Sequence, residues 1–521
     1  MKSLSTILLL LCTSLLFPSL LYAQNVPMNH ELEVEYQLSA AQQLPLSASA
    51  MHPWIVQVPD SDSVKRTRGS WVARKLFREH LIGLDSGGIK FTIDPLVNFT
   101  GGYETVEGKT TWLNTRGFIV RGRLGEQFAF ETSFAENQGV FSSYLDKFIR
   151  KNGIVPGSGY VRSYGKAGFD YAMASGYLSY TPGKYFNFQL GTGKHFIGEG
   201  YRSMLLSDQS FNYPFLRITT SFWHIKYTNL YAQLQDLTHS TDGAAYWRKK
   251  YTAMHLLSWD VTKNFNIAFF EAVIWSAKDS LAQRGFEINY INPVIFMRPV
   301  EFSVGSPDNM VMGFMANYRW NKTTIYSQFL LDEFETKNVF KGEGSYRNKS
   351  GLQIGVKCLE PMGVKGLYML TELNQARPFT YSHWDRMTNY GQYNQPLAHP
   401  LGANFREWVN MVRYQKGRWI GEAKVIAALY GMDLNGENFG MNIFESYNTR
   451  FQDKGNYIGS GLKTHLFYTD LQCRYVINPA MHLEVVAGMK YRNETNAAFK
   501  QKDNEFYLGV RTSLLNLYGD F

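Results

Sequence analysis

The sequence has few cysteines and no long apolar segment after its first two dozen residues. Three of the 521 residues are cysteine: Cys12 lies in the apolar N-terminal run, and Cys358 and Cys473 fall on one parity of alternating segments. We expect two unpaired thiols rather than a disulfide framework, and no Cys-x-x-Cys or Cys/His spacing indicates zinc. The lack of a second apolar run of about 18 residues argues against a helical membrane protein.

Catalytic motifs are also lacking. The glycines between residues 191 and 200 do not have the spacing of a dinucleotide-binding loop. The carboxylates at 332–335 are more typical of a solvated rim than of an acid–base pair. Residues 382–385 place Ser, His and Asp close in sequence, but adjacency is not triad geometry and no nucleophile elbow is present. We therefore expect no enzyme activity, no cofactor and no metal.

The N-terminus has the pattern of a secretory signal peptide, residues 1–23. Lys2 precedes a mostly apolar run over 7–21, and Ala23 supplies the small residue before a cut at Gln24. The net charge of +9 then falls by one to +8. This mild excess is consistent with an anionic partner, such as an acidic polysaccharide or lipid headgroup, and equally with a basic lumen. No nucleic-acid partner is expected.

The rest of the chain predicts an all-β fold, a transmembrane antiparallel β-barrel. Aromatic residues make up 15% of the sequence, as the aromatic belts of a barrel require. Ile325 and Phe329 alternate with Tyr326 and Gln328, so one face of that strand is apolar and the other polar. Short hairpin turns are predicted at residues 123–126, 181–184, 227–229, 262–264, 320–322, 361–364, 416–417 and 478–480.

Counting the alternating segments gives about eighteen strands. An even number returns both ends of the barrel to the periplasm. The final predicted strand covers 504–515, within a stretch that ends on Phe521. Alternating apolar and polar residues before a terminal phenylalanine are typical of the strand that closes a barrel. The predicted strands cover 89–99, 111–122, 127–136, 171–180, 185–194, 216–226, 229–237, 251–260, 265–275, 309–319, 323–333, 349–359, 365–375, 404–415, 418–430, 460–477, 481–492 and 504–515.

The segment 24–88 before the barrel, which spans 89–521, has a different composition. It contains Pro45, Pro53 and Pro59 and then a basic stretch, and Ser70 is placed to cap a short helix. We interpret it as a short, partly helical periplasmic segment; a disordered leader is the alternative.

Three long loops are too apolar or aromatic to be simple solvated loops. Loop 276–308 contains an apolar run over 290–300, which we expect to fold into the mouth or lumen and constrict it. Loops 195–215 and 376–403 combine aromatic, Arg, His and Pro residues, and we expect them to join it in a plug.

These loops also carry the candidate ligand-binding residues. Arginine forks and aromatic faces bind sugars and anionic groups, but the same side chains can hold loops together. Both interpretations stay open. The candidates are Arg202, Arg217, Arg298, Glu301, Arg377, Tyr381, His383, Tyr393 and His399.

The loop sequences resemble a known family. Residues 198–208 and 214–217 look like the outer-membrane capsule assembly family, Wzi. Residues 291–293, 298–302, 306–309, 377–383 and 393–404 are similar to its branch of gliding motility proteins, RemB. The resemblance covers about 89–521.

This resemblance implies an eighteen-stranded barrel in the Gram-negative outer membrane, with its mouth occluded by loops. It also implies that the barrel holds capsular or surface polysaccharide. The RemB-like branch instead implies a structural or adhesion role in gliding motility, with other outer-membrane proteins as partners. A diffusion channel is the third hypothesis. We expect outer-membrane lipids to surround the barrel.

Overall fold

The computed structural model describes residues 23–26, 28–39, 44–57, 69–237, 247–278, 284–305, 308–335, 342–512 and 516–521. The predicted signal peptide lies outside these residues, apart from Ala23 at its end. No helix among them is long and apolar enough to cross a membrane.

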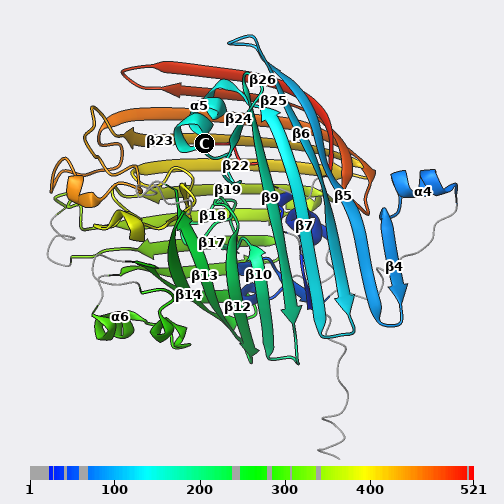
Figure 1. The fold of residues 1–521 in the computed structure, drawn as a ribbon, viewed down its shortest axis with the longest axis horizontal. Helices are drawn as coiled ribbons and strands as arrows, with labels where there is room; N and C mark the ends of the chain where they lie inside the picture. The colour runs from blue at the N-terminus through cyan, green and yellow to red at the C-terminus, as the bar shows by residue number, and fades with distance from the viewer. Residues whose placement is uncertain are drawn as a thin grey trace, which may run out of the picture.

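Eighteen long antiparallel strands form a closed barrel, which confirms the predicted fold class (Figure 1). Strand β26 pairs with β5 and closes the wall. Two short strands, β4 (Ile82–Ser86) and β8 (Arg162–Tyr164), add to β5 and β9. The eighteen strands are β5 (Ile89–Glu104), β6 (Lys109–Leu124), β7 (Phe128–Val140), β9 (Gly168–Tyr180), β10 (Phe186–Gly193), β12 (Tyr213–Phe222), β13 (Ile225–Asp236), β14 (Arg248–Thr262), β15 (Phe265–Ser276), β16 (Asn309–Trp320), β17 (Thr323–Leu331), β18 (Ser350–Leu359), β19 (Leu367–Ala376), β22 (Phe405–Lys416), β23 (Trp419–Met432), β24 (Leu462–Asn478), β25 (Leu483–Thr495) and β26 (Lys500–Thr512).

The predicted alternation is present in the wall. In β17, Ile325 and Phe329 are exposed on the outside, whereas Tyr326 and Gln328 are buried inside. Apolar side chains on the outside and polar ones inside are the pattern of a barrel surrounded by hydrocarbon. Seven of the eight predicted turns lie at or beside strand ends.

The predicted turn at 227–229 is wrong. Thr228 and Asn229 lie within β13, where they pair with Thr219 and Ile218 of β12. The chain instead turns at Trp223 and His224, and Trp223 adopts a positive φ of 53°. A bulky residue in that conformation is uncommon. The prediction therefore placed the turn at residues 227–229, where the residue types are more typical of turns.

The first part of the N-terminal segment, in the described residues up to 57, lies inside the barrel. Helix α2 (His30–Ser39) places Glu31 in ion pairs with Arg474 of β24 and Arg511 of β26. Arg413 of β22 donates to the Glu31 carbonyl at 2.8 Å. The acidic first turn of α2 thus meets cations of the wall, pairings that become visible only when the strands are assembled.

Three short elements continue this internal segment: α3 (Leu46–Ser49), β2 (Met51–His52) and β3 (Ile55–Gln57), which pairs with β1 (Ala23–Asn25). Ser47 of α3 binds Asp260 of β14 through both its backbone N–H and its hydroxyl. Helix α4 (Trp71–Phe77) lies outside, beside β4 (Figure 1). Ser70 caps it by accepting from the Ala73 N–H at 3.4 Å, as predicted.

The C-terminal tail, residues 516–521, also returns into the lumen. Strand β26 spans Lys500–Thr512, and residues 513–515 of the predicted closing strand lie outside the described residues. Tyr518 donates to Asp208 at 2.5 Å, and Tyr144 donates to the Gly519 carbonyl. Phe521 packs edge-on against Phe148 of α5 (Ser143–Asn152) with ring centroids 5.0 Å apart. The terminal phenylalanine is therefore a plug residue and not part of a membrane-facing strand.

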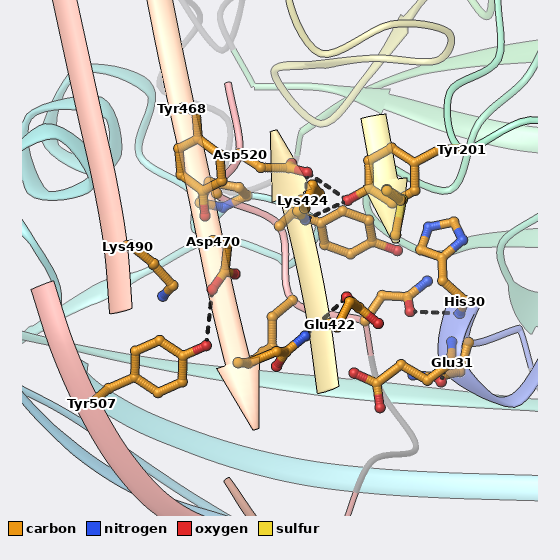
Figure 2. A pocket seen from close by; sticks show the side chains of 18 of the residues that line it. His30, Glu31, Tyr201, Glu422, Lys424, Tyr468, Asp470, Lys490, Tyr507 and Asp520 are labelled. Atoms are coloured by element: carbon orange, nitrogen blue, oxygen red, sulfur yellow. Dashed lines mark hydrogen bonds and ion pairs between the residues drawn. The ribbon is translucent and has the colours of Figure 1, made fainter. Parts of the chain in front are cut away.

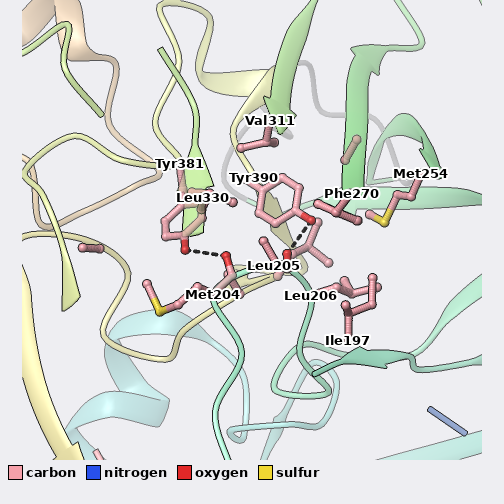
Figure 3. Close-up of a cluster of buried hydrophobic side chains, with 14 of the residues drawn as sticks. Ile197, Met204, Leu205, Leu206, Met254, Phe270, Val311, Leu330, Tyr381 and Tyr390 are labelled. Carbon is pink, nitrogen blue, oxygen red and sulfur yellow. Dashed lines mark hydrogen bonds between the residues drawn. The ribbon is translucent and has the colours of Figure 1, made fainter. Parts of the chain in front are cut away.

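Loops 195–215 and 376–403 fill the middle of the lumen, as predicted. Met204, Leu205 and Leu206 pack with Tyr381 and Tyr390 in one buried cluster (Figure 3). Tyr381 donates to the Met204 carbonyl and Tyr390 to the Leu205 carbonyl, both at 2.7 Å. The wall contributes inward-facing apolar side chains to the same cluster, namely Leu230, Met254, Phe270, Ala272, Val311 and Leu330.

The apolar run 290–300 of loop 276–308 does not enter the lumen, so that prediction is wrong. Tyr290 and Met297 are buried against Tyr231, Ala253 and Trp275. These wall residues lie on the parity opposite to the inward-facing row, so the loop lies on the outside of the barrel. It carries the short helices η2 (Ile288–Ile291) and α6 (Arg298–Val304; lower left in Figure 1).

Replacement of Leu205 by Ala should destabilise the plug. Leu205 is fully buried, and a Cβ built on Gly313 would lie 2.4 Å from it, so the packing is tight. The lost apolar contacts and the cavity should lower the free energy of unfolding by about 2–5 kcal/mol. Urea titration of the vesicle-embedded protein, followed by heat-modifiable gel mobility, measures this. Leu434→Ala, at a partly exposed position outside the buried core, should change it little; equal effects would contradict the packing argument.

Candidate functional site

A luminal chamber of about 230 Å³ lies between α2, the C-terminal tail and the wall formed by β22 to β26 (Figure 2). Charged and phenolic side chains from all three sources point into it. The residues labelled in Figure 2 are His30, Glu31, Tyr201, Glu422, Lys424, Tyr468, Asp470, Lys490, Tyr507 and Asp520.

Asp520 of the tail is the centre of the main ion cluster in this chamber. Its carboxylate meets Arg202 at 3.2 Å and Lys424 at 2.8 Å, and it accepts from the Tyr201 hydroxyl at 2.5 Å. Burial alone would raise the pKa of Asp520, but Arg202 and Lys424 hold that pKa well below its ordinary value. Arg202 also pairs with Glu407 at 3.2 Å, so one arginine joins a loop, the wall and the tail.

Other charged side chains of the chamber also have a hydrogen-bond or ion-pair partner. Asp470 accepts from Tyr507 at 3.0 Å, and Lys490 meets Glu505 at 3.4 Å. Among the described residues, no group of three His, Cys, Asp or Glu side chains is arranged to hold a metal ion. The chamber offers neutralised charge and hydroxyl groups, which suit water or a polyhydroxyl compound better than a reactive group.

A second group of side chains lies at the end of the barrel opposite the short turns; Trp384 and Arg347 are exposed there, whereas Tyr346 is buried. We call Tyr346, Arg347, Trp384, Tyr447 and Arg450 the extracellular cap; they come from three different loops. Arg450 lies 3.8 Å and Arg347 5.6 Å from the centroid of the Tyr346 ring. The Tyr346 and Tyr447 rings are 5.7 Å apart.

Hydrogen bonds to backbone carbonyls hold the three cap loops together. Ser446 donates to the Trp384 carbonyl at 2.7 Å, and the Tyr346 N–H donates to the Asp453 carbonyl at 3.1 Å. The Trp384 side chain remains 43% exposed and Arg347 is exposed. Exposed aromatic faces beside guanidinium groups can bind sugar rings and acidic substituents.

Six of the nine candidate residues are buried and have partners inside the protein. Arg217 donates to the Pro53 carbonyl at 3.1 Å, and His383 is 2.6 Å from the Thr388 hydroxyl. His399 pairs with Glu407 at 2.7 Å, and Tyr393 packs on Phe211. Arg202 and Tyr381 complete the set. Such contacts hold the loops together, which is the second of the two interpretations of these side chains. A ligand role for these residues stays a prediction.

The other three candidates lie apart from that group. Arg377 is partly buried, and its Nε donates to the Asn348 carbonyl at 2.8 Å. Arg298 and Glu301 belong to α6 on the outer wall. The structure therefore does not bring the nine residues together in one surface. Cap residues such as Tyr346 and Arg450 were missed, although aromatic and arginine residues recur together in loops 334–348 and 431–459.

Known proteins resemble this one in fold rather than in sequence. No protein-family model matches the chain, and no curated protein does. A solved structure described as Wzi, an outer membrane protein involved in group 1 capsule assembly in Escherichia coli and a carbohydrate binding β-barrel, matches with a TM-score of 0.52. That match has 10% identity and covers 94% of this chain and 99% of that chain.

Weaker matches are two further outer-membrane barrels. OprD from Pseudomonas aeruginosa gives a TM-score of 0.41 at 12% identity, over 81% of this chain and 92% of its own. OccAB2 from Acinetobacter baumannii gives 0.43 at 9% identity, over 81% and 96%. At such identities the likeness to Wzi establishes the fold, that of Gram-negative outer-membrane barrels. The RemB-like assignment finds no counterpart in these comparisons.

Docking of the tail should persist at mildly acidic pH because the folded pKa of Asp520 is lowered. A lowered carboxylate pKa stabilises the folded state above the unfolded value of about 3.9, and this stabilisation is lost as the pH falls below it. A spin label at Leu517→Cys, in a protein whose other cysteines are Ser, should stay immobile from pH 7 to about pH 4.5.

Asp520→Asn is the comparison for this measurement. It removes the negative partner of Arg202 and Lys424, so the same label should become mobile even at pH 7. A label already mobile at pH 7 without this substitution, or immobile with it, would contradict the role of Asp520.

Proposed function

We propose that the protein is a non-enzymatic outer-membrane barrel that holds surface polysaccharide through the extracellular cap. The observation that carries this proposal is the cap itself, in which tyrosine, tryptophan and arginine side chains converge from three loops above a filled lumen. Tyrosine and tryptophan rings stack on the apolar faces of sugars, and arginine pairs with carboxylate or phosphate substituents. The fold likeness to a carbohydrate binding barrel is consistent with this function.

The filled lumen argues against a diffusion channel. Residues of the N-terminal segment, two long loops and the tail all lie in the lumen and bond to one another or to the wall. Purified protein in a planar bilayer should therefore pass little steady current. A stable open conductance of porin size would support the channel hypothesis instead.

Replacement of Trp384 and Arg450 by Ala should weaken retention of polysaccharide at the cell surface. The loss of one aromatic face costs about 0.5–1.5 kcal/mol, and the loss of a charge-assisted bond adds to it, so binding should weaken by about tenfold or more. Cell-bound and released polysaccharide are measured by immunoblot, and binding to the purified barrel by calorimetry. We expect more released polysaccharide at an unchanged total yield.

Trp419→Ala is the matched control, because Trp419 is an exposed tryptophan beside a short turn at the opposite end of the barrel. It should leave retention unchanged. Normal retention by the double variant, with normal heat-modifiable mobility, would rule out the cap as the binding surface. Unchanged retention after deletion of the whole gene would rule out the function.

A further inference from the structure

Part of the long loop between β15 and β16 lies on the outside of the barrel, where hydrocarbon is expected. We call residues 288–297 the outer strap. In the wall beneath it, Leu230, Met254, Ala272 and Val311 form one in-register row that faces the lumen plug. The adjacent row of Tyr231, Ala253, Val273 and Met310 must face the opposite way, and the strap residues Tyr290 and Met297 pack on that row.

The strap covers polar side chains that would otherwise face lipid. Asn229, His255 and Glu271 are direct cross-strand neighbours on the outward face of β13, β14 and β15. All three are buried. Glu271 lies six residues along β15 from Phe265 of the aromatic belt. At about 3.3 Å per residue and a tilt of about 40°, this is roughly 15 Å along the barrel axis, within an apolar band about 25 Å tall.

Side chains of the wall pair four backbone polar groups of the strap. Glu271 accepts from the N–H groups of Phe296 at 2.8 Å and Met297 at 2.7 Å. Tyr231 donates to the Ile291 carbonyl at 2.9 Å, and Tyr227 donates to the Pro293 carbonyl at 2.5 Å. An irregular segment exposed to hydrocarbon must have its backbone groups paired within the protein, and these four bonds supply such pairing.

The exposed side chains of the strap are mainly apolar. Its exposed polar residues, Asn289 and Asn292, are hydrogen-bonded locally: Asn289 donates to Glu287 at 2.7 Å, and Asn292 accepts from the Val294 N–H at 3.1 Å. Ile288 is 72% exposed, Val294 62% and Phe296 60%, and Ile291 is exposed beside them. This surface continues the exposed apolar belt of the neighbouring strands, which includes Phe314 of β16. A segment whose backbone is bonded to the wall and whose outer side is mainly apolar fits the hydrocarbon region better than water.

We propose that the outer strap lies within the membrane, with Ile291, Val294 and Phe296 packed against lipid acyl chains. Glu271 is the positioning residue, because its carboxylate holds the backbone of the strap against the wall. The strap converts a polar stretch of the outer wall into an apolar surface for lipid. This inference is independent of the polysaccharide function.

Single cysteines placed on the strap test its depth. Phe296→Cys is made in the full chain with Cys358 and Cys473 replaced by Ser, labelled with a polarity-sensitive fluorophore, and reconstituted in vesicles containing lipid with brominated acyl chains. Folded protein is selected by heat-modifiable mobility. We expect strong quenching by the brominated chains, comparable to Phe314→Cys on the belt, whereas Trp384→Cys in the cap should be quenched little. Quenching at 296 as weak as at 384 would overturn the proposal.

A measurement on whole cells removes any dependence on refolding. A charged, membrane-impermeant maleimide should label Phe296→Cys at least about tenfold more slowly than Trp384→Cys, because it does not partition into hydrocarbon. Equal labelling rates would place the strap in water and overturn the proposal. A photo-crosslinker at Val294 should give lipid adducts; a specific protein adduct would show that a protein covers the strap, and would also overturn it.

The role of Glu271 is tested at Met297, which is fully buried beneath the strap. Met297→Cys should resist a lipid-soluble maleimide. The additional change Glu271→Ala removes the acceptor of two backbone N–H groups, so the strap should separate from the wall and the cysteine should react. Continued protection in the folded double variant would refute the positioning role of Glu271.

Discussion

The structure depends on a constraint imposed by hydrocarbon, in which every backbone group must be paired and outward side chains must be apolar. A closed barrel meets this requirement, but it directs the polar half of each strand inward. In a barrel of eighteen strands the inward charges are too far apart to neutralise one another across the lumen. The lumen must therefore hold water or other protein, and here it holds the two ends of the chain and two long loops.

The ion pairs of the lumen show how this filling is specified. Arg474 and Arg511 face the acidic turn of α2, whereas Arg202 and Lys424 face Asp520 of the tail. Each of these four cations has an anion that comes from a different part of the chain. Because an unpaired buried charge is costly, such pairs fix the position of each plug segment more than they add net stability. The extracellular cap then rests on a rigid base, which favours preorganised binding at its surface.

The sequence predicted the wall well and the filling less well. The β16–β17 hairpin could be located because alternation and turn chemistry are local. By contrast, Tyr381 and Arg202 are ordinary loop residues in sequence, and only the assembled barrel shows that both are buried. The outer strap was assigned to the lumen because an apolar run avoids water, and lipid satisfies that condition as well as a core does. The return of the tail into the lumen was not predicted, because alternation is a local signal that ends with the closing strand.

The position of α2 has a consequence for the order of assembly. Glu31 binds Arg511, and 480 residues of chain separate the two. Helix α2, the first helix of the described residues, therefore completes its contacts only when the last strand is in place, at the seam where β26 meets β5. Contacts of such long sequence separation form late, since loop closure must precede them. A chain that stops before β26 lacks both the closing strand and one of the cations that hold α2, so closure of the wall and seating of the N-terminal plug are one event.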